Sequence, residues 1–335
     1  MSVETKDLKF TISSSPHIRD EESICHIMWH VNLALAPAAV FAVFWFGIPA
    51  LVNMAVGAFF AVASEYVWQR AMGQKVTALD GSAFLTGILL AMSMSPLLPP
   101  YMVAIGSVLA IVVAKQSMGG LGWNIFNPAH IGRAALMVSW PVAMTTWTKM
   151  QNMGAENAVD AMTSATPLAI LKYQGYDALV NVFGGASEMY QALLLGTRNG
   201  SLGETSTVLL AVGGLYLIWR GYANWVVPAG MIGTVALLTW VFGPSGLFTG
   251  APLVHVMTGG LMLGAFFMAT DMVTIPMTVK GQLIFAVGAG AITVLIRLVG
   301  GYPEGVCYSL LLMNAVTPLI DRFVKPRIFG AGGAK

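Results

Sequence analysis

The sequence predicts an all-α integral membrane protein of about ten transmembrane helices, arranged as two inverted five-helix repeats. Three observations predict this fold: an apolar composition, a series of ten apolar segments, and short motifs that recur in the same order in both halves. Of the 335 residues, 56% are hydrophobic and only 10% are charged, whereas a soluble domain is about 25% charged. A chain this apolar cannot cover its surface in water, so we expect lipid around it.

Ten apolar segments follow a polar N-terminal segment at 1–26, and most approach the ~20 residues that a helix needs to cross a bilayer. The segments lie at 27–48, 51–69, 82–97, 101–117, 127–146, 205–219, 224–242, 252–270, 281–299 and 305–320. The first five form a predicted repeat over 27–146, and the last five form a second repeat over 205–320. A long loop at 147–204 joins the repeats, and a tail at 321–335 follows them.

The distribution of Lys and Arg predicts the orientation of the chain. Ten spans place both termini on one side of the membrane, and the short turns on the opposite side contain neither Lys nor Arg. The basic residues on the side of the termini are Arg70, Lys75, Lys115, Arg220, Lys280, Arg322, Lys325, Arg327 and Lys335. Because basic loops stay in the cytoplasm, we expect cytoplasmic termini and an extracytoplasmic loop at 147–204.

Similar short motifs recur in the two halves. The third segment contains Thr86–Leu90 and the eighth contains Thr258–Met262, and each is followed by a Gly-Gly pair and then by an Asn near a Pro. Since five is odd, the two halves would be inverted, a plan in which broken helices meet near the membrane midplane. We expect the short third segment and the eighth, which runs into Thr270 and Asp271, to be the broken helices. Chance recurrence of Gly and Leu is the alternative.

Carboxylates and amides inside or at the edges of spans predict a polar path. Such groups are costly toward lipid, their oxygens suit a hard cation such as Na⁺, and carboxylates can relay protons. The candidate ion-path residues are Asp271, Glu65, Asp80, Asn127, Asn314 and Glu304. For any single residue, an interhelical hydrogen bond is the favoured alternative. The two distant cysteines indicate no metal site, and the net charge of +2 gives no indication of nucleic-acid binding.

The long loop contains a hydroxyl-rich stretch from Asp160 to Pro167. Pro167 biases Thr166 away from the helical region of backbone space and holds its side chain out. From local physics alone, three hydroxyls and a carboxylate at this spacing favour a capped turn.

This stretch resembles the flavinylation motif, whose final Thr carries FMN through a phosphoester bond. The matching positions are Asp160, Thr163, Ser164, Ala165 and Thr166, with Ser164 where Gly is more common. Three further stretches, at 13–18, 122–129 and 304–321, extend the similarity from end to end. The sequence thus resembles the family shared by the D subunit of Rnf electron-transport complexes and the B subunit of Na⁺-translocating NADH:quinone reductases (NqrB/RnfD family). The chain length and the Ser-Ser-Pro-His-Ile start favour the Rnf branch.

The resemblance implies a multi-pass subunit of the bacterial cytoplasmic membrane, part of a translocase that moves electrons between ferredoxin and NAD and couples them to Na⁺ or H⁺ transport. It implies FMN on Thr166, recognition of the other motif residues by a flavin transferase, and a possible noncovalent riboflavin. Thr166 has no catalytic role in turnover. Without a dinucleotide fingerprint or iron–sulfur ligands, the chain needs other Rnf subunits as partners. The alternatives are a B-type quinone reductase subunit and a channel or secondary transporter of the same fold.

Overall fold

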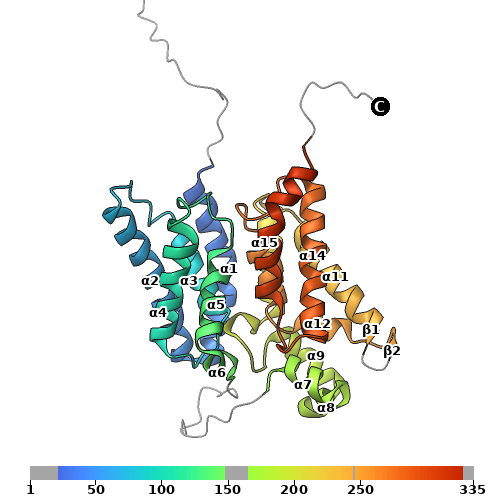
Figure 1. Cartoon of the computed structure of the whole chain (residues 1–335). Helices are drawn as coiled ribbons and strands as arrows, with labels where there is room; N and C mark the ends of the chain where they lie inside the picture. The colour runs from blue at the N-terminus through green and yellow to red at the C-terminus, as the bar shows by residue number, and fades with distance from the viewer. Residues whose placement is uncertain (1–21, 148–164, 244–245, 327–335) are drawn as a thin grey trace, which may run out of the picture.

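The computed structural model describes residues 22–147, 165–243 and 246–326, and it is mostly helical. Its two halves stand side by side, with α1–α6 on one side and α10–α15 on the other (Figure 1). The first half contains α1 (Ile24–Phe46), α2 (Ile48–Ala71), α3 (Ser82–Met92), α4 (Pro100–Leu109), the π-helix η1 (Ala110–Gln116), α5 (Pro128–Ser139) and α6 (Pro141–Thr145).

The second half has a similar series of helices, one of which is interrupted. It contains α10 (Thr207–Trp219), α11 (Val226–Val241), α12 (Pro252–Met257), α13 (Leu261–Leu263), the π-helix η3 (Gly264–Met268), α14 (Val279–Leu298) and α15 (Val306–Phe323). Two short strands, β1 (Phe242–Gly243) and β2 (Gly246–Leu247), pair antiparallel after α11. Each predicted apolar segment therefore coincides with one helix or with consecutive helices.

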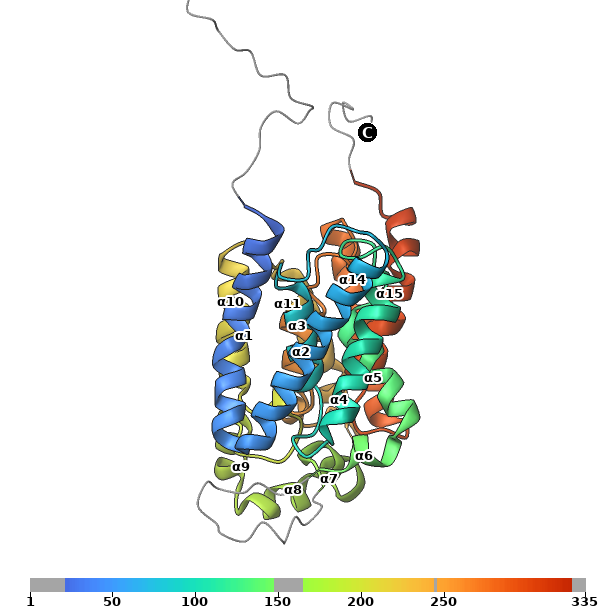
Figure 2. The ribbon, with the colours of Figure 1, turned by 90° about the vertical axis from the view of Figure 1, so that its left-hand side faces the viewer.

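The segment that joins the halves is helical within its described part. It forms α7 (Pro167–Gln174), α8 (Tyr176–Phe183), α9 (Ala186–Leu195) and the 3-10 turn η2 (Leu202–Glu204). A small apolar cluster centred on Leu179, Met189 and Leu193 holds these helices together and includes Val254 of α12. Figures 1 and 2 show α7–α9 at one end of the molecule, opposite the start of α1 and the end of α15. We call these the loop end and the terminal end.

Helix length and composition agree with a multi-pass membrane protein. Among the described residues, α1, α2 and α14 are each long and apolar enough to cross a bilayer alone. Shorter apolar helices pack beside them, and α3 is only 11 residues long. Small residues allow this packing: a methyl group added at Gly87 would lie 2.3 Å from the carbonyl oxygen of Gly57.

The eighth apolar segment is broken as predicted, but the break lies inside the segment. α12 stops at Met257, Thr258 is extended, and Gly259 takes a positive φ of 69°. Only glycine adopts this backbone conformation without strain. The helix then resumes at Leu261 and ends at Met268, shortly before Thr270 and Asp271.

Lys115 does not lie in a loop at the membrane surface, where the charge count placed it. It belongs to the π-helix η1, and its ammonium is buried against the carboxylate of Glu65 at 2.7 Å. A cation that is neutralised within the protein carries no information about orientation, so Lys115 leaves the set of loop residues on which that prediction rests.

Candidate functional site

A cavity of about 310 Å³ opens at the loop end, where the two halves of the molecule meet. This size falls at the lower end of the roughly 300–1,000 Å³ of typical ligand sites. α5, α6, α7 and α15 all contribute to its walls. The cavity, which we call the loop-end cavity, is lined by Arg133, Ala134, Met137, Met144, Thr145, Thr146, Trp147, Ala165, Thr166, Ala169, Tyr302, Pro303, Glu304, Cys307 and Tyr308.

Thr166 lines this cavity because it is the N-cap of α7. Its backbone is extended (φ −66°, ψ 153°), as expected before Pro167, and its hydroxyl accepts the Ala169 N–H at 3.2 Å. Thr166 therefore caps a helix, while most of the hydroxyl-rich stretch for which local physics favoured a capped turn lies outside the described residues. Thr166 is only 6% exposed, whereas Ala165 beside it is exposed. The other predicted motif residues, Asp160, Thr163 and Ser164, lie outside the described residues.

A buried ion pair forms one wall of the loop-end cavity. Arg133 of α5 pairs with Glu304, which precedes α15, and their side chains are 7% and 15% exposed. The other oxygen of Glu304 accepts the Gly260 N–H at 2.6 Å. The Nε of Arg133 has no hydrogen-bond partner among the described residues. A buried donor without a partner is costly, but this nitrogen is enclosed by the protein, so the cavity wall offers the cationic charge of Arg133 rather than this N–H.

Contacts with the turn between α14 and α15 fix α7, and hence Thr166, over the cavity. The ammonium of Lys172 donates to the carbonyl oxygens of Gly300 and of Tyr302, the latter at 3.1 Å. The hydroxyl of Tyr173 donates to Gly301 O at 3.0 Å. Partial burial lowers the pKa of Lys172 from its ordinary value, yet these carbonyls at the end of α14 are natural partners for a cation.

The break in the eighth segment adjoins the same ion pair. Glu204 Oε2 accepts the Gly259 N–H at 3.1 Å, next to the bond from Gly260 to Glu304. The guanidinium of Arg297 donates to Thr258 O at 3.0 Å and to the carbonyl oxygen of His255. Two carboxylates thus satisfy the N–H groups of the break, and one cation satisfies its carbonyls.

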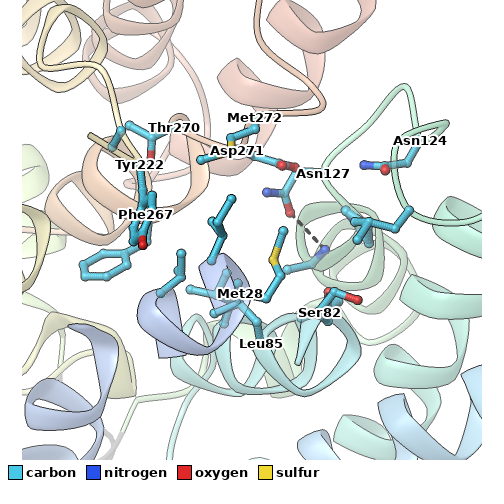
Figure 3. A pocket seen from close by; sticks show the side chains of 18 of the residues that line it. Met28, Ser82, Leu85, Asn124, Asn127, Tyr222, Phe267, Thr270, Asp271 and Met272 are labelled. Carbon is cyan, nitrogen blue, oxygen red and sulfur yellow. Dashed lines mark hydrogen bonds between the residues drawn. The ribbon is translucent and has the colours of Figure 1, made fainter. Parts of the chain in front are cut away.

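A second, smaller cavity of about 80 Å³ lies at the terminal end, again between the halves. Asp271, Asn127, Asn124, Thr270 and Ser82 contribute polar groups to it (Figure 3). Asp271 accepts the Val273 N–H at 3.2 Å and the Thr274 hydroxyl at 3.4 Å. The Oδ1 of Asn124 is buried and has no partner among the described residues. We call this the terminal-end cavity.

Lys115 connects two further predicted residues to the terminal-end cavity. Its Nζ lies 2.7 Å from Glu65 Oε2 and 2.6 Å from the hydroxyl of Ser82, and it lines the cavity itself. Ser82 in turn donates to the carboxylate of Asp80 at 2.5 Å. Glu65 therefore contacts the buried ammonium directly, and Asp80 is connected to it through Ser82.

Asn314 completes the set of predicted ion-path residues. With its amide in the orientation that satisfies both atoms, Asn314 accepts the Asn127 N–H at 3.0 Å and donates to Leu310 O at 3.2 Å. Asn127 Oδ1 caps α5 by accepting the Ala129 N–H. Five of the six predicted residues thus gather at the terminal end, whereas Glu304 belongs to the loop-end cavity.

Sequence reasoning missed Arg133 as a cavity residue, Lys115 as a buried counter-charge and Lys172 as an anchor. Arg133 carried a signal, because a charge within an apolar segment is expected to have a partner. Lys115 carried the same signal at the end of the fourth segment. Nothing in the local sequence indicates the role of Lys172, since all three of its acceptors are backbone carbonyls more than 120 residues away.

Comparison with known proteins decides the family. The profile described as the NQR2, RnfD, RnfE family matches residues 11–330, which is nearly the whole chain. The chain belongs to the NQR2, RnfD, RnfE family. This confirms the resemblance found in the sequence motifs.

Three members of the NQR2, RnfD, RnfE family illustrate the range of identities. The chain is 66% identical over 322 residues to the D subunit of the proton-translocating ferredoxin:NAD(+) oxidoreductase complex of Clostridium ljungdahlii, covering 96% of each chain. It is 43% identical over 327 residues to the D subunit of the Na(+)-translocating complex of Acetobacterium woodii, covering 97% of this chain and 96% of the relative. It is 36% identical over 355 residues to the D subunit of the ion-translocating oxidoreductase complex of Escherichia coli, covering 96% and 98%.

Proposed function

We propose that this chain is the D-type membrane subunit of an Rnf-type complex, which transfers electrons between ferredoxin and NAD and couples the transfer to Na⁺ or H⁺ translocation. Full-length similarity to subunits named in these terms supports the proposal. The relatives from Clostridium ljungdahlii and Acetobacterium woodii differ in the ion that their names state, so the choice of ion remains open. The other subunits of the complex would supply the iron–sulfur centres and the NAD site.

We further propose ten membrane crossings in two inverted repeats, with the terminal end in the cytoplasm and the loop end outside. The alternating directions of the helices in Figures 1 and 2 support this arrangement, as do Arg70 in the last turn of α2 and Arg322 in the last turn of α15. A flavin transferase acting outside the membrane would then meet Thr166 on its own side.

The proposed cofactor is FMN, esterified to the hydroxyl of Thr166. The observation that carries this proposal is that Thr166 lines a cavity of about 310 Å³ whose walls offer aromatic rings and the cation of Arg133. The site residues fit the group: Tyr302, Tyr308 and Trp147 supply flat apolar surface, and the N-terminus of α7 favours the phosphoester charge. When bound, the flavin supplies one- and two-electron redox chemistry.

The experiment compares the chain with its Thr166→Ala variant, each co-expressed with a flavin transferase. We expect in-gel fluorescence of the denatured chain and an added FMN in its intact mass, both lost in the variant. Thr146→Ala is the matched control, because Thr146 lines the same cavity but lies outside the motif. An unmodified mass for the parent chain would contradict the flavin assignment and favour a channel or secondary transporter.

For ion translocation, we propose a path that begins at the terminal-end cavity, with Asp271 as its carboxylate and Asn124 as an oxygen ligand. The unpartnered, buried Oδ1 of Asn124 supports this, since an amide oxygen suits a hard cation. In membrane vesicles that contain the whole complex, Asp271→Asn is expected to reduce ferredoxin-driven ion uptake. Asp177→Asn, a carboxylate of α8 at the loop end, is the control. Unchanged uptake in Asp271→Asn would exclude this path.

A further inference from the structure

The Arg133–Glu304 pair faces the cavity in which the proposed flavin would lie. Both residues line the loop-end cavity together with Thr166, although they come from opposite halves of the chain. The ribityl chain of FMN would extend from the hydroxyl of Thr166 into a space whose only charged side chains, among the described lining residues, are these two.

An ion pair fixes Arg133, but not every N–H group of its guanidinium has a hydrogen-bond partner among the described residues. One of its terminal nitrogens binds Glu304, while its Nε has no partner among the described residues. A guanidinium presents its donors as a rigid planar fork, so the position of one nitrogen fixes the direction of the others. The ion pair therefore fixes the position of the guanidinium charge in the wall of the cavity.

Each oxygen of the Glu304 carboxylate has a protein partner. Its Oε1 accepts the Gly260 N–H at 2.6 Å and its Oε2 pairs with Arg133. Both oxygens of the carboxylate thus have protein partners, and the pair is fixed in the wall of the cavity. In a site with little water, such a charge acts strongly on nearby groups.

We propose that Arg133, oriented by Glu304, is a positioning residue that sets the reduction potential of the flavin attached at Thr166. The inference rests on the proposed function. Reduction of a flavin by two electrons from an iron–sulfur donor, with uptake of one proton, adds one negative charge to the ring system. A cation that faces the ring favours that charge and raises the potential, and its anionic partner opposes this effect.

The test is a redox titration of the purified, flavinylated complex, followed by flavin absorbance, with four proteins in one charge cycle. Arg133→Gln is expected to lower the midpoint potential, with reduction at least tenfold less favourable, which is about 30 mV for a two-electron couple. Glu304→Gln leaves the cation uncompensated and is expected to raise the potential by a similar factor. The midpoint potential of the double variant is expected to lie between those of the two single variants.

Arg220→Gln is the control, because Arg220 is exposed at the terminal end. The flavin midpoint potential of this variant is expected to match that of the parent. Potentials that do not differ among parent and both single variants would overturn the inference. If one single variant does not fold, the other single variant is compared with the parent. A midpoint potential that is equal in these two would also overturn the inference. A parent chain without attached flavin would instead contradict the proposed function, so the two failures are distinguishable.

Discussion

Glu304 binds Gly260 through its Oε1 at 2.6 Å and thereby joins the loop-end cavity to the break in the eighth apolar segment. One carboxylate therefore contacts both Arg133, on the wall of the proposed flavin site, and the backbone of an interrupted helix. Discontinuous helices form the substrate and ion sites of many transporters. A charge change in the cavity has a direct physical route to this break through Glu304.

Gly260→Ala tests how much this contact stabilises the fold. The backbone of Gly260 has an ordinary φ of −75°, but an added methyl group would lie 2.5 Å from Glu304 Oε1. The carboxylate must move and the buried hydrogen bond is lost, so we expect a loss of about 1–3 kcal/mol of stability. Thermal unfolding in detergent measures it. Gly301→Ala, where an added methyl meets nothing within 4 Å, is the control. Equal unfolding temperatures for the two variants would contradict the prediction.

A double-mutant cycle tests the buried pair of Lys115 and Glu65, whose side chains are 2% and 1% exposed. Lys115→Met leaves a buried carboxylate without its cation, and we expect a loss of about 3–5 kcal/mol. Glu65→Gln combined with Lys115→Met removes both charges and is expected to recover most of that loss. Thermal unfolding of the four proteins gives the coupling between the two sites. Additive losses would show that the two charges do not stabilise one another.

The elements that the sequence predicts well depend on local pattern. Hydropathy places the apolar segments because side chains that face lipid are apolar, while each helix satisfies its backbone polar groups internally. The turn at Thr166 follows from the steric effect of Pro167 on the residue before it. The recurring motif predicts an interruption of the eighth segment near Thr270 and Asp271, but its position inside the segment depends on the positive φ of Gly259.

The elements that the sequence could not predict depend on packing between the halves. Arg133 and Glu304 are 171 residues apart, and their pairing follows only from how α5 and α15 meet. Lys115 looked like a loop residue because hydropathy shows where an apolar segment ends but not where a terminal side chain points. The separation of Glu304 from Asp271 likewise requires three-dimensional coordinates, since both had the same signal of a carboxylate beside an apolar segment.

Alkaline titration tests the contact between α8 and α9. The hydrogen bond with Tyr176 (3.4 Å between the hydroxyl oxygens), with burial, raises the pKa of Tyr190 to about 12. In the unfolded chain this tyrosine loses its proton near 10. Between these pH values the folded protein keeps a proton that the unfolded chain releases. The contribution of Tyr190 to the free energy of unfolding is therefore fully present below about pH 10, and it is lost as the pH rises toward about 12.

Tyrosinate absorbance measures this titration as the difference between the parent and Tyr190→Phe. Tyr176→Phe removes the hydrogen bond and is expected to lower the pKa of Tyr190 toward its ordinary value. A difference spectrum that titrates near 10 in the parent would contradict the prediction. The measurement is feasible because Tyr190 belongs to the helices at the loop end rather than to the apolar segments.

Lys172→Met tests whether α7 is anchored by the carbonyl end of α14. The Lys172 ammonium donates to three backbone oxygens there, those of Ile296, Gly300 and Tyr302. Methionine keeps the length of the side chain but removes the cation, and a cation at a helix C-terminus contributes about 0.3–1 kcal/mol. Limited proteolysis is expected to cut α7 several-fold faster in this variant, while α1 and α14 are cut at the parental rate. Lys172→Arg, which keeps the charge and the donors, is the control and is expected to stay close to the parent. Equal cleavage of α7 in all three proteins would show that Tyr173 and the apolar contacts of α7 hold Thr166 over its cavity without this cation.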